Sequence, residues 1–230
     1  MLNPNGINVL SLFDGISCAR VALERAGIKV NNFYASEVDK YAMQISAKNY
    51  PDIVQVGSVV GLGTSQFKNI DLIVGGSPCQ DLSIAKKDRK GLDGERSGLF
   101  WEYVRILNEV KPKYFILENV ASMPKEAKAL ITETLGVEPI MIDAALVSAQ
   151  RRKRLFWTNI PNVTQPEDGG ILLKDILEDG SDTSFDVYND KFVDGNKAKT
   201  LGTNPQCRTA VAGQLVLKEK SNTIRTGGRG

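Results

Sequence analysis

The sequence predicts an α/β fold built on an open, mostly parallel sheet. Three short apolar runs, residues 7–13, 71–74 and 114–117, have the length and composition of buried strands. Segments with helical spacing of apolar residues separate them, and a glycine turn follows the first run. A strand, a glycine turn and a helix open a Rossmann-like nucleotide-binding unit, so we expect a ligand at the carboxyl end of the sheet.

The first predicted strand leads into a turn at residues 14–17 and a helix from Cys18 to Ala26, which Gly27 ends. The dinucleotide-binding pattern GxGxxG is absent, because Ser17 stands where a second glycine could lie. The turn therefore favours a nucleotide ligand but argues against NAD.

A second strand, residues 32–36, is followed by Glu37 and by a helix at 40–49 that Pro51 stops. An acid about 20 residues after the glycine turn suits the ribose hydroxyls of an adenosine ligand. A solvated acid at a strand end is the ordinary alternative.

The alternation of strands and helices continues to about residue 160. The further predicted elements are a strand at 53–56, a flexible loop at 61–65, a helix from Gly98 to about Val110, a strand at 114–117, a helix at 125–135, a strand at 139–147 and a return strand at 152–160. We expect the last two strands to form a hairpin at the sheet edge. Beyond Pro161 the alternation stops, and residues 172–177 could form one short helix.

The stretch GGSPCQDLS, residues 75–83, follows the apolar run at 71–74. Its two glycines let the backbone turn sharply where the strand ends, and Pro78 restricts the chain directly before Cys79. A lone cysteine is most often a small buried hydrophobe. Here the strand end, the glycines and the cations in the following loop instead favour a reactive nucleophile.

The residue types that are missing narrow the chemistry. The 230 residues contain no histidine, which excludes Ser-His-Asp and Cys-His catalysis within this chain. The three cysteines form no CxxC pair, which argues against a zinc or other metal site and for a reducing cytoplasm. No apolar run of about 18 residues and no signal peptide is present, so we expect no membrane partner.

Three motifs occur in order: GSPCQ at 76–80, ENV at 118–120 and QRRKR at 150–154. Together they resemble the cytosine-C5 DNA methyltransferases, and the motif sequences are most similar to those of the de novo animal enzymes and their phage and bacterial relatives. The resemblance covers roughly residues 7–160. It implies a Rossmann-like S-adenosylmethionine-dependent methyltransferase fold, with a catalytic domain at 1–160 and a small, irregular, partial target-recognition region at 161–230.

The resemblance also implies catalytic roles. Cys79 would attack C6 of a flipped cytosine, and Glu118 would hydrogen-bond N3 and the exocyclic amine. A carboxylate after four apolar residues is costly to bury without a partner, so burial would favour its protonated form. Arg152 or Arg154 would contact the base carbonyl and the neighbouring phosphate. An ordinary strand-end acid is the alternative for Glu118.

S-adenosylmethionine is the implied cofactor. Ser17 departs from the glycine usual in the family, which is tolerable because the backbone would do the binding. Ser58 stands where family members usually have an aspartate for the adenine amino group, and a hydroxyl or backbone contact could substitute. The implied cofactor-binding residues are Phe13, Asp14, Gly15, Ile16, Ser17, Glu37, Val38, Ser58, Pro78 and Leu99.

Charge is distributed unevenly although the net charge is only +2. Residues 167–194 hold nine acids and two lysines, whereas residues 195–230 hold seven basic residues and one acid. The basic segments suggest a surface for double-stranded DNA, or else an ordinary solvated face. The expected DNA-binding residues are Ser83, Lys86, Lys87, Arg89, Lys90, Lys197, Lys199 and Arg225. The similar segments 197–201 and 220–224 could be two strands facing one groove, or a chance repetition.

The resemblance therefore predicts a DNA cytosine-C5 methyltransferase from a phage or a restriction-modification system. Two alternatives stay open: a tRNA cytosine-C5 methyltransferase, and a non-catalytic or split methyltransferase-fold module that binds nucleic acid. The Gly-Asn segment that closes the family's cofactor pocket has no counterpart here. We therefore expect that the chain binds the cofactor weakly alone or needs a second chain.

Overall fold

The computed structural model describes residues 6–78 and 98–172, Asp175, and the backbone of four short strands between residues 184 and 216. The chain divides into two compact units, residues 1–141 with 154–164, and residues 142–153 with 165–230. None of the described helices could span a membrane.

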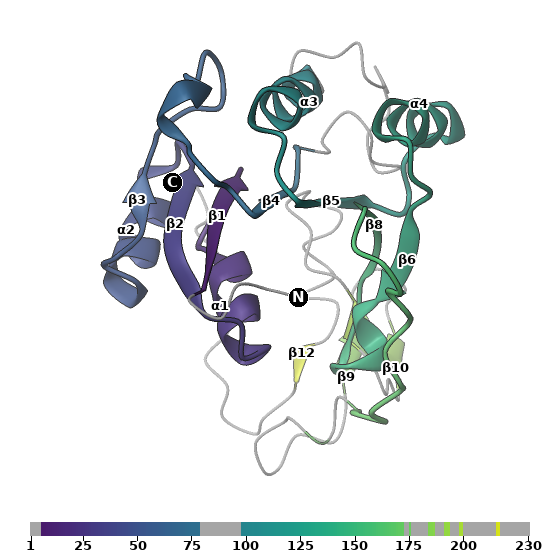
Figure 1. The fold of residues 1–230 in the computed structure, drawn as a ribbon. Coiled ribbons are helices and arrows are strands. Elements are labelled where there is room, and N and C mark those ends of the chain that lie inside the picture. Colours follow the sequence, from purple (N-terminus) through teal and green to yellow (C-terminus); the bar gives the residue numbers. More distant parts are fainter. Residues whose placement is uncertain are drawn as a thin grey trace, which may run out of the picture. The chain divides into compact units, whose positions relative to one another are not determined.

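The main sheet has seven strands in the order β3-β2-β1-β4-β5-β8-β6 (Figure 1). The strands from β3 to β5 are parallel, and β8 is antiparallel to β5. This confirms the predicted α/β fold. Strand order reverses between β1 and β4, which is the switch point where open α/β sheets bind ligands. The strands are β1 Ile7–Leu12, β2 Val30–Ser36, β3 Val54–Gln55, β4 Leu72–Gly75, β5 Tyr114–Val120, β6 Ile140–Asp143 and β8 Lys153–Thr158.

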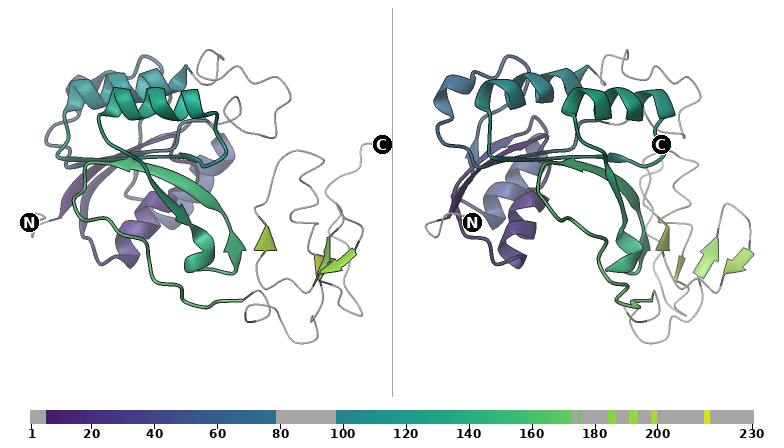
Figure 2. Two further views of the ribbon diagram at one scale, coloured as in Figure 1. Left: turned by 90° about the vertical axis from the view of Figure 1, so that its right-hand side faces the viewer. Right: turned by 45° about the vertical axis from the view of Figure 1, so that its right-hand side comes forward.

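Two helices cover each face of this sheet. Helices α1 (Cys18–Arg25) and α2 (Lys40–Asn49) lie on one face, and α3 (Leu99–Val110) and α4 (Lys125–Leu135) lie on the other (Figure 2). The helix bounds agree with those predicted. Asp39 caps α2, because its carboxylate accepts from the backbone N–H groups of the first turn.

The core is largest beneath α3 and α4. These helices bury Phe100, Tyr103 and Ile131 in the same cluster as Leu10, Leu117 and Trp157 of the sheet. The indole of Trp157 donates to the Thr132 hydroxyl at 3.0 Å, so the polar atom of the largest buried side chain has a partner. A smaller cluster lies under α1.

Two predicted strands end well away from the residues predicted. Strand β5 continues to Val120 rather than ending at residue 117, because residues 116–120 pair with β8. The strand predicted at 139–147 ends at Asp143, whose carboxylate accepts from the N–H of Ala145 and turns the chain into the 3-10 helix η3, Ala144–Leu146.

One further correction concerns a predicted loop. A 3-10 helix, η1 (Thr64–Gln66), occupies part of the segment predicted as a flexible loop. The expected pairing of the last two strands at the sheet edge is confirmed, because β8 and β6 are neighbours at that end of the sheet and β6 is the edge strand.

The second unit contains short strands. Strand β7 (Gln150–Arg151) pairs in parallel with β11 (Ala198–Lys199). An antiparallel sheet has the order β10-β9-β12, formed by Lys191–Val193, Ser184–Asp186 and Leu215–Val216. The strand predicted near 197–201 is therefore present but shorter. The segment at 220–224 and most of the helix predicted at 172–177 lie outside the described residues.

Gly75 provides a test of packing at the end of β4. A Cβ at this position would lie 2.9 Å from the Tyr103 ring and 3.2 Å from the carbonyl oxygen of Leu12, which is backbone. We expect Gly75→Ala to lower the free energy of unfolding by about 1–3 kcal/mol, as overpacking does. Urea denaturation would measure the change. Gly63→Ala is the matched control, because nothing lies within 4 Å of its Cβ position and its φ is −72°. Equal denaturation midpoints for the two variants would contradict the packing described here.

Candidate active site

The carboxyl ends of four parallel strands lie in one row across the sheet. Leu12 of β1 pairs with Ser36 of β2 on one side and with Gly75 of β4 on the other, and Gly75 pairs with Leu117 of β5. The next residue on each strand is a predicted site residue or leads directly to one. In the same order across the sheet, from β2 to β5, these are Glu37, Phe13, Gly76 and Glu118. At about 4.8 Å per strand, the row spans about 14 Å at the switch point.

The glycine turn after β1 is tied to Glu37. Phe13, Gly15 and Ser17 all have left-handed backbone conformations, with φ of 57°, 62° and 64°. The Gly15 N–H donates to Glu37 Oε2 at 2.7 Å, and Glu37 Oε1 accepts from the N–H groups of Val38 and Asp39. About one of the carboxylate's four acceptor positions stays open for a ligand hydroxyl.

Asp14 is a buried acid with an unused oxygen. Its Oδ2 accepts a hydrogen bond from the Ser17 hydroxyl, whereas its buried Oδ1 has no hydrogen-bond partner. Burial raises the pKa of Asp14, against the hydrogen bonds of Ser11 and Ser17, and the charge of Glu37 raises it further. A cationic ligand with N–H donors would satisfy this oxygen and offset both acids. Among cofactors, S-adenosylmethionine has that character.

Ser17 takes part in a buried polar chain that the sequence did not reveal. Its hydroxyl lies 2.6 Å from that of Ser46 on α2, and Gln55 Nε2 donates to the Ser46 hydroxyl at 3.3 Å. A left-handed conformation costs a non-glycine residue roughly 1–2 kcal/mol. The hydrogen bonds of Ser17, which glycine could not make, offset this cost.

Apolar side chains beside the row are left uncovered. Val38 is 74% exposed directly after Glu37, and Ile16 and Val60 are also exposed. Leu99, at the start of α3, and Pro78 are partly buried, and Ser58 is exposed. Exposed apolar surface next to polar groups that lack partners is typical of a ligand site.

Glu118 lies against the chain that leads to Cys79. A Cβ on Gly76 would come within 3.0 Å of Glu118 Oε2, so only glycine fits there without moving the carboxylate. Arg154 of β8 pairs with Glu118 through Nε and Oε1 at 2.6 Å. The Glu118 side chain is 34% exposed and has the ion-pair partner that a carboxylate after four apolar residues needs.

Asn119 fixes the residue two positions before Cys79. Its side-chain amide donates to the Ser77 hydroxyl at 3.2 Å, and its carbonyl accepts from the Val120 N–H at 2.8 Å. Ser77 and Asn119 are both buried. Asn119 is the middle residue of the ENV motif at 118–120, in which only Glu118 has a predicted role. Cys79 itself lies outside the described residues.

The two predicted arginines belong to different compact units. Arg154 is in the first unit with Glu118, whereas Arg152 is in the second. The Arg152 N–H donates to Asp143 Oδ1 at 2.8 Å. Burial opposes the charge of Asp143, but hydrogen bonds from the N–H groups of Ala145 and Arg152, together with the charges of Lys153 and Arg151, lower the pKa of that carboxyl.

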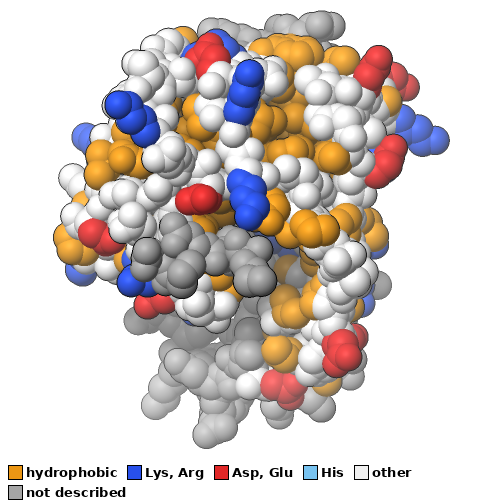
Figure 3. All heavy atoms as spheres, in the orientation of Figure 1, with side chains coloured by type: hydrophobic (Ala, Val, Ile, Leu, Met, Phe, Trp, Pro, Cys, Tyr) orange, Lys and Arg blue, Asp and Glu red, His pale blue; other side chains and the backbone are white. Residues whose placement is uncertain are grey.

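The structure gives limited information on the predicted DNA-binding residues. Lys199 contributes backbone to β11, and the others lie outside the described residues. They are Ser83, Lys86, Lys87, Arg89, Lys90, Lys197 and Arg225. On the face shown in Figure 3, the described Lys and Arg side chains are scattered singly among acidic and apolar ones.

Ionisation of the Asp14 carboxyl should make the free energy of unfolding depend measurably on pH. Its pKa in the folded state lies above the ordinary value of 3.8, so folding is disfavoured progressively as the pH rises and the carboxyl ionises. We expect Asp14→Asn to gain stability relative to the natural chain between about pH 4 and pH 7. Urea denaturation across this range is the measurement, with exposed Glu133→Gln as the control. Parallel pH profiles for the natural chain and Asp14→Asn would contradict this.

Comparison with known proteins gives a consistent set of matches. A family model described as C-5 cytosine-specific DNA methylase matches residues 7–226. The orphan methyltransferase M.SPRI of Bacillus phage SPR is 32% identical over an alignment of 189 residues, and the match covers 76% of this chain and 43% of that protein. The type II methyltransferase M.NgoBV of Neisseria gonorrhoeae is 29% identical over 212 residues, covering 81% of this chain and 50% of that protein. The chain thus spans about half the length of these relatives.

A solved structure shares the fold. It is described as a candidate DNA modification methyltransferase encoded within a prophage of E. coli. The match has a TM-score of 0.54 and 25% sequence identity, and it covers 66% of this chain and 46% of that chain.

Proposed function

Because the chain belongs to the C-5 cytosine-specific DNA methylase family, we propose that it transfers a methyl group from S-adenosylmethionine to C5 of cytosine in double-stranded DNA. The observation that carries the proposal is the row at the switch point. In this row, the glycine turn after β1 and Glu37 after β2, which would bind the methyl donor, lie beside Gly76 and Glu118 of the next two strands. One ligand at the first pair of strands and one at the second would therefore be neighbours.

The methyl donor would be held by the glycine turn and Glu37. S-adenosylmethionine, when bound, supplies a methyl group on a positively charged sulfur. The open acceptor position of Glu37 suits a ribose hydroxyl, and Asp14 Oδ1 suits a cationic N–H donor. Val38 and Ile16 offer exposed apolar surface for the base.

The remaining residues would activate the cytosine. The Cys79 thiolate would add to C6, which turns C5 into an enamine carbon able to accept the methyl group. Glu118 would hold N3 and the exocyclic amine and deliver a proton to N3, while Arg154 keeps its carboxylate in place at 2.6 Å. Loss of the C5 proton to water, expulsion of the Cys79 thiolate and return of the N3 proton to Glu118 would then restore the aromatic base.

The DNA would have to present the cytosine outside the helix, because these groups act on C6 and N3 together. Residues 161–230 would contribute to target recognition, with the basic residues at 195–230 and Lys86–Lys90 at phosphates. A cytoplasmic location is part of the proposal, because three cysteines without a CxxC pair suit a reducing compartment. A second chain that supplies a closing segment stays a prediction from the resemblance.

A methyl-transfer assay tests this function. The chain is incubated with S-adenosylmethionine carrying a labelled methyl group and with either duplex DNA or total tRNA, and nucleosides are analysed by mass spectrometry. Labelled 5-methylcytosine in DNA is the expected result. Label in tRNA alone would replace the proposed substrate, and a bound donor without transfer to either nucleic acid would favour a non-catalytic module.

A further inference from the structure

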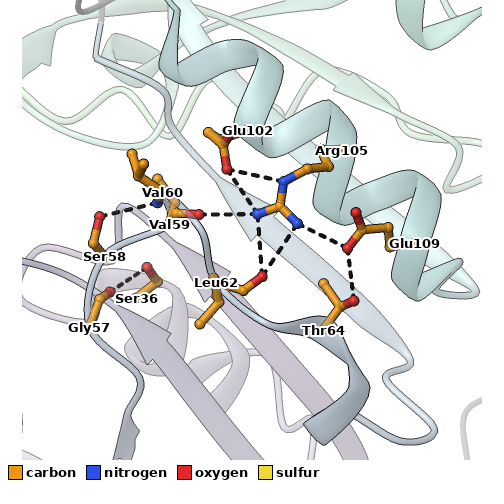
Figure 4. A network of polar contacts seen from close by, with 10 residues as sticks. All are labelled: Ser36, Gly57, Ser58, Val59, Val60, Leu62, Thr64, Glu102, Arg105 and Glu109. Carbon is orange, nitrogen blue, oxygen red and sulfur yellow. Dashed lines mark hydrogen bonds and ion pairs between the residues drawn. The ribbon is translucent and has the colours of Figure 1, made fainter.

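Arg105 joins parts of the first unit that lie far apart in the sequence (Figure 4). Its Nε and Nη2 donate to Glu102 Oε2 at 3.1 and 2.8 Å, and its Nη1 donates to Glu109 Oε2 at 2.9 Å. Both Nη atoms also donate to the carbonyl of Leu62 at 3.3 Å, and Nη2 donates to that of Val59 at 3.3 Å. One guanidinium therefore connects α3 to the loop that follows β3.

A second contact extends this connection. The Thr64 hydroxyl donates to Glu109 Oε2 at 2.8 Å, so the carboxylate that pairs with Arg105 also holds the start of η1. Because two carboxylates already flank the guanidinium, Arg105 is poorly placed to bind a phosphate. Its planar fork instead suits several fixed acceptors at once.

The sheet holds the start of the loop after β3, next to Ser36 of β2. Strand β3 is only two residues long, and its edge of the sheet ends there. Val59 and Leu62 are buried, which leaves Ser58 and Val60 exposed. Ser58 is anchored on both sides, since the Ser36 hydroxyl donates to the Gly57 carbonyl at 2.6 Å and the Val60 N–H donates to Ser58 Oγ at 3.1 Å.

We propose that Arg105 is a positioning residue that determines how well the chain recognises the adenine base of its methyl donor. The inference rests on the proposed function. Arg105 would act by fixing the Val59 and Leu62 carbonyls, and so the exposed edge of the loop at Ser58 and Val60, before the donor binds. Without this support, the loop would present its hydrogen-bonding groups to the base in a less defined geometry.

Binding of two ligands measures this role directly. Isothermal titration calorimetry would give the Kd of S-adenosylhomocysteine and of S-inosylhomocysteine, in which hypoxanthine replaces adenine and reverses the hydrogen bonds at the base edge. We expect the natural chain to prefer the adenine ligand by at least about tenfold. In Arg105→Met the Kd of the adenine ligand should rise by about tenfold and that of the hypoxanthine ligand by less than about twofold, so that the preference for adenine is largely lost.

Two further variants separate positioning from general stability. Ile131→Val removes a methylene from the buried face of α4, whereas Arg105 holds the loop from α3, so it should leave the preference unchanged while lowering the melting temperature. Arg105→Lys keeps the charge but cannot reach both glutamates and both carbonyls, so its preference should lie between those of the natural chain and Arg105→Met.

The outcomes are distinguishable. Equal weakening of both ligands in Arg105→Met, an unchanged preference, or the same loss of preference in Ile131→Val would overturn the role of Arg105 while leaving the proposed function intact. If Arg105→Met does not fold, an Arg105→Lys variant with the same preference for the adenine ligand as the natural chain would overturn the role of Arg105. A natural chain that binds neither ligand overturns the donor site, and this inference with it.

Discussion

Replacing Cys79 by serine should abolish methyl transfer to DNA while leaving donor binding unchanged. The proposed reaction needs a covalent bond from this side chain to C6, and a serine hydroxyl is far less ionised than a thiol near neutral pH. We expect kcat to fall by at least about 10⁴-fold, as it does when other covalent enzymes lose their nucleophile. The measurement is the rate of 5-methylcytosine formation with a saturating donor.

Cys18→Ser is the matched control for this change. Cys18 is an exposed free cysteine at the start of α1, outside the row of strand ends. Its replacement should leave the rate within about twofold of the natural chain. A Cys79→Ser variant with substantial activity would remove the covalent step from the account, whatever the control does.

Glu118→Gln should produce the second largest loss, a fall in kcat of about 10²–10³-fold. Glutamine has the shape of glutamate and can hydrogen-bond the cytosine edge, but it cannot deliver a proton to N3. The Kd of the variant for duplex DNA should change little, which would assign the fall in kcat to the chemical step. Single-turnover rates at a saturating donor concentration measure it.

Stability provides the check on Glu118→Gln. The ion pair with Arg154 is partly exposed, so its loss should change the free energy of unfolding by no more than about 1 kcal/mol. Exposed Glu126→Gln on α4 controls for the removal of one negative charge. Equal rates for Glu118→Gln and the natural chain would show that the carboxylate does not act on the base.

Much of the fold could be predicted because, in β1 and β4, the apolar run in the sequence ends where the strand ends. In each, an apolar run ends at glycine or at a residue that leads to a turn, which marks both the strand and its carboxyl end. The register that aligns Ser36, Leu12, Gly75 and Leu117 could not be predicted in the same way. It depends on pairing between segments that are distant in the sequence.

The bounds of β5 show why polar residues mislead. Glu118 and Asn119 look like the end of a strand, yet both lie within it, because β8 supplies backbone partners and Arg154 supplies a counter-charge. Neither partner is adjacent in the sequence. The same limit applies to Ser17, which looked like a tolerated departure until Ser46 of α2 provided its partner.

Arg105 was detectable in part. Its spacing from Glu102 and Glu109 indicates pairs along one helix face, three and four residues apart. That pattern alone predicts a solvated ion pair. The carbonyls of Val59 and Leu62, more than forty residues earlier, give the arginine a different role, and only the packing of α3 beside that loop reveals them.

A covalent trap tests the central claim most directly. The chain is incubated with S-adenosylmethionine and a duplex DNA library containing 5-fluorocytosine, in which fluorine prevents loss of the group at C5. The account predicts a DNA–protein adduct on a denaturing gel, with the attachment mapped by mass spectrometry to Cys79 and lost in Cys79→Ser. Labelled 5-methylcytosine formed in ordinary DNA without any adduct in the fluorinated duplex, or an adduct on another residue, would contradict it.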